Sequence, residues 1–154
     1  MACPALTNKG GSFAISDGPI TECDPGLSDF EGYTFIPVGS IGSSGDTGVT
    51  TDIVTYPVWG DGLTPQGKGD ATGNNPTIEF LHRDSPGMEI MLEASAISNQ
   101  SNYAWRYTWA NGDIEYGMGL VANPTYMKGG GSDVRRISFT LISNLEPIFV
   151  YASP

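Results

Sequence analysis

The chain has 154 residues, a length that favours a single domain, and its 21 glycines and 11 prolines favour many turns and short strands over long helices. Its formal net charge of −10 would repel nucleic-acid phosphates, which argues against a nucleic-acid-binding surface. Two cysteines, Cys3 and Cys23, are too few for a disulfide framework, although a Cys3–Cys23 bridge stays an alternative to two free thiols. Together with the single histidine, His82, they do not have the spacing of a zinc site.

Residues 1–32 are polar and rich in turns, and they predict an N-terminal arm with one short strand at 12–16. The arm is either a mobile terminus or a segment that becomes ordered against a neighbouring subunit. In the second case its apolar residues Phe13 and Ile15 are candidate subunit contacts. The first six residues lack the regions of a signal peptide, and no apolar run reaches the ~20 residues of a membrane span, so we expect a soluble protein made in the cytoplasm.

Residues 33–154 predict one β domain, with strands at 33–38, 49–56 and 77–82. A long loop, rich in Gly, Pro and Asn, is predicted at about 57–76 between the last two strands. Loops longer than ~12–15 residues are usually functional or disordered. We therefore expect this segment to be an assembly or binding loop, with candidate subunit contacts at Trp59 and Leu63.

One short α-helix is predicted at about 85–97, with Ser85 as its N-cap and Pro86 in the first helical position. At ~100° per residue, one face carries Met88, Met91 and Leu92. The nearly opposite face carries Ile90, Ala94 and Ile97. This second apolar stripe packs either on the domain's own core or on a neighbouring subunit, which makes its three residues candidate subunit contacts.

The last third of the chain predicts a β-hairpin and a closing strand. Large aromatic residues alternate over 103–109, and Asn111-Gly112 is a strong turn signal before a return strand at 114–121. A further strand at 134–142 places Ile137, Phe139 and Leu141 on its core face. A short last strand is expected within 145–151. Together these patterns predict a mainly β fold.

No enzymatic grouping stands out in the sequence. His82 lies on the apolar side of its predicted strand, where a structural role is the simpler interpretation. Gly62–Gly69 imitates a phosphate-binding loop but lacks the Ser or Thr after Lys68 and the helix that should follow. Carboxylates are plentiful, but no pair stands at a suggestive position, and Asp113 and Glu115 are expected to be solvated. We therefore expect no enzyme activity, no metal and no cofactor.

The order of these features resembles the tail tube (major tail) protein family of long-tailed bacteriophages. Residues 103–116 are similar to the family's aromatic strand, Asn-Gly or Asp-Gly turn and aromatic return strand. Residues 77–87 are similar to the strand that leads through Asp-Ser-Pro-Gly into the helix. The stretches 134–149 and 8–18 resemble the family's final strands and its start, whereas 19–32 has no clear counterpart.

The resemblance implies a β-sandwich or barrel of two packed antiparallel sheets with one short flanking helix. It also implies hexameric rings that stack around a tape measure protein in the virion tail, contact tail terminator and distal tail proteins, and let DNA pass without specific binding. Six subunits of −10 each would make an acidic channel that repels phosphates. The candidate lumen-facing residues are Asp52, Glu79, Asp113 and Glu115, for each of which the outer surface is the alternative.

Three other functions stay open at this point. One is another virion or secretion-tube structural protein with the same architecture. The second is a lectin-like β-sandwich that binds through the 57–76 loop, and the third is a hydrolase that uses paired carboxylates.

Overall fold

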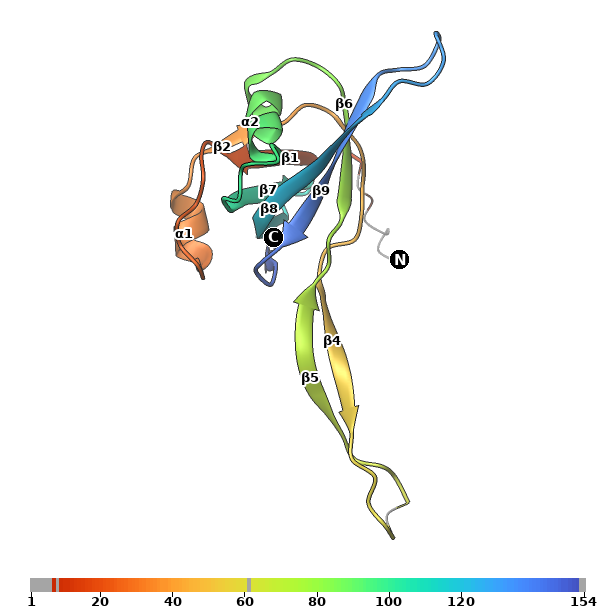
Figure 1. Cartoon of the computed structure of the whole chain (residues 1–154). Coiled ribbons are helices and arrows are strands. Elements are labelled where there is room, and N and C mark those ends of the chain that lie inside the picture. The colour runs from red at the N-terminus through yellow and green to blue at the C-terminus, as the bar shows by residue number, and fades with distance from the viewer. Residues whose placement is uncertain (1–6, 8, 61, 153–154) are drawn as a thin grey trace, which may run out of the picture.

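The computed structural model describes residues 7, 9–60 and 62–152. This part of the chain forms ten strands and two helices (Figure 1). In chain order they are β1 (Ser12–Ser16), α1 (Leu27–Gly32), β2 (Phe35–Pro37), β3 (Ile41–Ser44), β4 (Val49–Thr55), β5 (Gln66–Gly73), β6 (Thr77–Leu81), α2 (Pro86–Ala94), β7 (Tyr103–Thr108), β8 (Ile114–Met127), β9 (Arg136–Ser143) and β10 (Ile148–Val150). The chain is thus mainly β, with two antiparallel sheets and a short flanking helix, as predicted from the sequence.

The main sheet has the strand order β2-β1-β7-β8-β9-β6-β3, and β10 pairs with β8 off this path. The long strand β8 joins two regions, because its first half pairs with β7 and β10 and its second half pairs with β9. The register of β8 against β9 shifts between Ala122 and Thr125, where Asn123 has a φ of 54° and Pro124 has no N–H to donate. The β8–β9 ribbon therefore continues beyond the body of the sheet (Figure 1).

The main sheet carries apolar clusters on both faces. Strand β7 shows the alternation that causes this, because Tyr103, Trp105 and Tyr107 belong to the larger cluster and Ala104 belongs to the smaller one. Helix α2 covers the larger cluster with Met88, Met91 and Ala94. Helix α1 covers the smaller cluster with Phe30, whose ring stacks on Tyr116 at a centroid distance of 5.2 Å. The core-facing residues predicted on β9, Ile137, Phe139 and Leu141, are all fully buried.

Helix α2 begins as predicted, since the Ser85 hydroxyl oxygen accepts a hydrogen bond from the Met88 N–H at 3.1 Å and Pro86 opens the helix. Gly87 allows the helix to lie against β2, because a Cβ there would be 2.1 Å from the Pro37 carbonyl oxygen. The helix ends at Ala94 rather than Ile97. Ala94 is buried in the domain core, so the predicted second apolar stripe does not include it.

Four elements differ from the prediction. Strand β1 is an inner strand that pairs with both β2 and β7, so the chain from Ser12 onward is part of the domain rather than an extended arm. Helix α1 lies in the segment predicted as arm, and β3 lies between the predicted strands 33–38 and 49–56, in a Gly/Ser-rich stretch where no strand was predicted. The predicted loop at 57–76 contains the eight-residue strand β5.

Among the described residues, no helix is long and apolar enough to span a membrane.

Candidate assembly surface

Strands β4 and β5 form a separate two-stranded sheet that projects from the body as a long hairpin (Figure 1). Their antiparallel register runs from Val49 opposite Gly73 to Thr55 opposite Gln66. The register shifts once, between Thr51 and Ile53, which places an extra residue on β5. The hairpin is therefore a defined β-ribbon whose two outer edges have no strand partner among the described residues.

The base of the hairpin is fixed to the main sheet by backbone hydrogen bonds. The Gly45 N–H donates to the carbonyl of Thr77 on β6 at 2.8 Å, and the Asn74 N–H donates to the Gly48 carbonyl at 2.9 Å, which joins the two arms of the hairpin at its base. Gly73 lies against β9, because a Cβ there would be 2.9 Å from the Ser143 carbonyl oxygen. These contacts set the direction in which the ribbon leaves the body.

Apolar side chains are exposed along the ribbon and at its tip. Trp59 is 99% exposed, Leu63 is 83% exposed and Ile53 is 72% exposed. The other exposed apolar residues of this segment are Val49, Val54, Tyr56 and Val58. We call these seven residues the hairpin surface. The side chains of the candidate contacts Trp59 and Leu63 are thus exposed, and their role as subunit contacts stays a prediction.

A ribbon of this kind is unusual for a free monomer. A single two-stranded hairpin is at best marginally stable in water, and contiguous exposed apolar side chains typically mark an interaction surface. Unpaired strand edges add backbone donors and acceptors that another chain can use. The hairpin surface is therefore the strongest candidate for a contact with another protein chain.

The other candidate subunit contacts fall into two groups. Phe13, Ile15 and Ala94 are at most 1% exposed and pack in the domain's own core, so they cannot contact a neighbouring subunit through their side chains. The sequence does not distinguish the two cases, because an alternating strand or a helix with two apolar faces has the same pattern whether it packs in a core or in an interface. Ile90 is partly buried against the core, whereas Ile97 is 97% exposed.

The structure does not bring the four candidate lumen carboxylates together. Asp52 is exposed on β4, as a channel-lining residue would be. Glu79 on β6 forms an ion pair with Arg136, with 2.9 Å between Oε1 and Nη1. Asp113 and Glu115 are each only 9% exposed, so the expectation that they are solvated is wrong.

Asp113 joins the C-terminal segment to the β7–β8 turn. One carboxylate oxygen accepts the Ala152 N–H at 2.8 Å, and the other accepts the Asn111 side-chain amide at 2.9 Å. These hydrogen bonds lower the pKa of Asp113 below its usual value, since they favour the charged form. Asp113, which follows the Asn111-Gly112 turn, thus has a structural role, because it holds the C-terminal segment against this turn.

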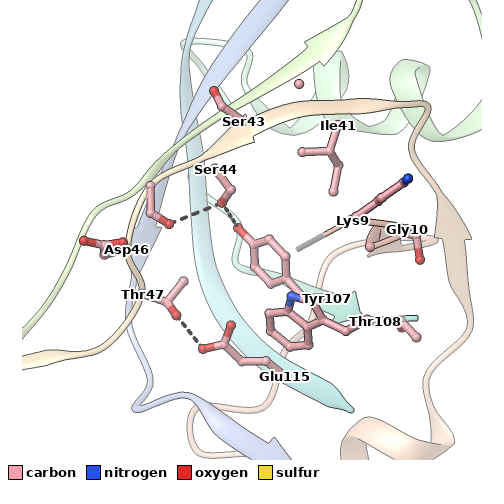
Figure 2. A pocket seen from close by; sticks show the side chains of 15 residues that line it. Lys9, Gly10, Ile41, Ser43, Ser44, Asp46, Thr47, Tyr107, Thr108 and Glu115 are labelled. Carbon is pink, nitrogen blue, oxygen red and sulfur yellow. Dashed lines mark hydrogen bonds between the residues drawn. The ribbon is translucent and has the colours of Figure 1, made fainter. Parts of the chain in front are cut away.

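Glu115 points into a cavity of about 790 Å³ between β3, β7 and the residues before β1 (Figure 2). Its carboxylate accepts a hydrogen bond from the Thr47 hydroxyl. Burial raises the pKa of Glu115, and the Thr47 hydrogen bond opposes this shift only in part. Sequence reasoning missed the cavity, because it depends on β3, which lies in a Gly/Ser-rich stretch without a strand pattern.

Of the remaining polar candidates, the structure describes Cys23 and His82. Cys23 is exposed and free, whereas Cys3 lies outside the described residues. The half-buried His82 ring lies 5.5 Å from the Tyr126 ring, between centroids. In the described ranges, no three His, Cys, Asp or Glu residues gather in a way that suits a metal ion.

No family model matches the chain, and no curated protein matches it by sequence. Solved structures do match its fold. The sheath/tube terminator of an extracellular contractile injection system (PVC, extended state) has a TM-score of 0.69 at 12% identity, over 98% of this chain and 100% of the other. The anti-feeding prophage tube terminating cap has a TM-score of 0.60 at 14% identity, over 99% and 94%. The SPP1 tail tube has a TM-score of 0.59 at 10% identity, over 97% and 81%. The chain therefore has the fold seen in tube and tube-terminator proteins of phage tails and injection systems.

Proposed function

We propose that the chain is a non-enzymatic structural subunit of a phage tail tube, which self-assembles into stacked hexameric rings around a tape measure protein and forms the channel for DNA ejection. The observation that carries the proposal is the β4–β5 hairpin, a projecting ribbon with seven exposed apolar residues on a fold shared with tube proteins. A second copy of the chain is the partner that such a ribbon meets in a homo-oligomer. Tail terminator and distal tail proteins would then contact the two ends of the tube.

Ring formation accounts for the exposed strand edges. Oligomers with head-to-tail contacts close into rings when the rotation between subunits allows it, and each edge strand then gains a partner. Stacking of rings would cover the hairpin surface, because the hairpin extends well beyond the body that it leaves (Figure 1).

An acidic channel fits the charge of the chain, and the four lumen candidates differ in how well their surroundings suit that role. Asp52 is the lumen candidate that stays exposed and unpaired with a cation in the described structure. Glu79 would contribute less negative potential, since Arg136 neutralises it. With a net charge of −10 per subunit, a channel of this kind would repel DNA phosphates and allow DNA to slide.

A tube terminator is the second candidate function. The likeness to the PVC sheath/tube terminator favours it, because that match covers all of the other chain at a TM-score of 0.69. A terminator would form one ring on a tube end rather than a growing tube. The two functions therefore differ in whether the chain adds to copies of itself without limit.

Negative-stain electron microscopy of the purified full chain, over a series of protein concentrations, tests both functions. Tubes of one diameter that lengthen with concentration support the tail tube, and single rings that never stack support the terminator. A protein that stays monomeric at every concentration would overturn both.

A hairpin variant makes the test specific. Residues 52–70 are replaced by Asn-Gly, which joins Thr51 to Ala71, two residues that already face each other in the register. We expect this variant to keep the near-UV CD spectrum of a folded body and to form no tubes. A matched control replaces only the exposed Val134 on the β8–β9 connection with Ser and should assemble normally.

A further inference from the structure

The cavity that contains Glu115 lies between β3, an edge strand of the main sheet, and β7, an inner strand of the same sheet; we call this place the seam. Strands β3 and β7 face each other there without backbone pairing, and the link between them is a hydrogen bond of 2.9 Å between the Ser44 hydroxyl and the Tyr107 hydroxyl (Figure 2). The exposed residues Lys9, Gly10 and Ser43 line the same cavity, so it is accessible from solvent. The seam thus leaves an accessible hollow of about 790 Å³.

Inside this hollow lies a carboxylate that has no cationic partner among the described residues. Glu115 is 9% exposed, and its carboxylate accepts a hydrogen bond from the neutral Thr47 hydroxyl. The one ion pair within the described residues is Arg136 with Glu79, which leaves Glu115 without a positive partner there. Lys9 is on the opposite side of the cavity from the Glu115 carboxylate (Figure 2). A buried carboxylate without a counter-charge costs folding free energy, so a cation that reaches it would be stabilised.

The wall beside Glu115 is aromatic. The Tyr107 and Trp109 rings stack with 6.1 Å between their centroids and 19° between their planes, and both residues line the cavity. Aromatic faces attract ammonium and guanidinium groups. Asp46, an exposed residue of the same lining, adds a second negative charge. A buried carboxylate beside aromatic rings is a combination that selects an organic cation over an anion or a neutral sugar.

We propose that this cavity binds a cationic guanidinium or ammonium group, which forms an ion pair with Glu115 and lies against the Tyr107 and Trp109 rings. Two sources can supply such a group. One is a free organic cation, and the other is Lys68 of a second copy, which is the only Lys or Arg between residues 10 and 82 and is exposed on the projecting hairpin. The binding site itself does not depend on the proposed tube function, because a monomer contains all of it.

NMR titration of the full-length monomer with ethylguanidinium tests the site, with the uncharged N-ethylurea as the matched ligand. We expect saturable shifts at Glu115, Tyr107 and the Trp109 indole with ethylguanidinium, and none with ethylurea. The apparent pKa of the Glu115 carboxyl should also fall when the cation is bound, because an adjacent positive charge favours the carboxylate. No saturable shift, or equal binding of ethylurea, would overturn the proposal.

Substitutions locate the binding to the cavity. Glu115→Gln should weaken ethylguanidinium binding at least tenfold, whereas Asp70→Asn, which removes the same charge from the exposed hairpin, should leave it unchanged. If Glu115→Gln does not fold, Glu115→Asp keeps the charge but withdraws it by one methylene and should weaken binding to a smaller extent. Unchanged binding in a folded Glu115 variant would refute the assignment.

An assembly assay separates the two sources. If Lys68 of a second copy fills the cavity, Lys68→Met and saturating ethylguanidinium should each reduce assembly, and Lys68→Arg should preserve it. If the monomer binds ethylguanidinium while neither treatment changes assembly, a free cation is the ligand. A protein that binds ethylguanidinium but never assembles would refute the tube function and leave the cavity proposal standing.

Discussion

Substitution of Trp59 by Ser tests whether the hairpin surface drives assembly. Trp59 is 99% exposed, so its loss removes almost no contact within the subunit, and the free energy of unfolding should stay within ~0.5 kcal/mol of the original value. A Trp side chain that becomes fully covered buries roughly 150–250 Å², which is worth about 4–6 kcal/mol at ~25 cal/mol per Å². If docking covers half of that area, assembly loses about 2–3 kcal/mol.

That loss corresponds to a rise of roughly 30- to 140-fold in the concentration needed for assembly, because 1.4 kcal/mol is a factor of ten. Sedimentation velocity over a concentration series measures this threshold, and urea unfolding measures subunit stability. Val134→Ser is the matched control, since Val134 is 58% exposed on a different part of the surface and should not change the threshold. An unchanged threshold for Trp59→Ser would refute the role given to the hairpin surface.

Three further predictions concern the subunit itself. Ser85→Ala removes the oxygen that accepts the Met88 N–H at the start of α2, so the free energy of unfolding measured in urea should fall by about 1 kcal/mol. Ser85→Asp should restore most of this free energy. Gly87→Ala places a Cβ 2.1 Å from the Pro37 carbonyl oxygen, so the free energy of unfolding should fall by about 1–3 kcal/mol or more. A melting temperature equal to that of the original chain would contradict the close packing of α2 on β2. Asp113 has a folded pKa below its unfolded one, so its carboxylate stabilises the fold above the unfolded pKa, and this contribution is lost as the pH falls through the folded pKa. Asp113→Asn should therefore be less stable than the original chain at pH 7 and equally stable in strong acid, and a difference independent of pH would contradict this assignment.

The second half of the fold could be predicted well because its strands bury one face. Strong alternation of large apolar residues indicated β7, β8 and β9, and the Asn111-Gly112 turn joins β7 to β8 as expected. The buried side chains predicted on β9 are in the core. The helix start was also readable, since Ser85 and Pro86 carry a local signal that does not depend on the rest of the fold.

The first half was less readable because its elements depend on partners distant in sequence. Strand β5 contains Gly67, Gly69 and Gly73, and its side chains are exposed almost throughout. It has no apolar pattern that would mark it as a strand, and it is recognised only by its pairing with β4. Helix α1 has only Phe30 buried, which is too little for a periodic signal. The exposure of Trp59 and Leu63 on the hairpin could be predicted from the sequence. The burial of Glu115 in its cavity could not, since nothing local distinguishes this residue from a solvated carboxylate.

The hairpin also bears on the timing of assembly in the proposed tube. A ribbon that is marginally stable alone loses conformational freedom when it docks, and this loss costs conformational entropy at each contact. Two free copies would supply few compensating contacts, whereas a completed ring would present several docking sites at once in a fixed geometry. Elongation would then be faster than initiation, so the purified chain should assemble only after a lag and above a sharp concentration threshold. The number of tubes would be set by how many first rings form, and preformed rings added to the protein should remove the lag.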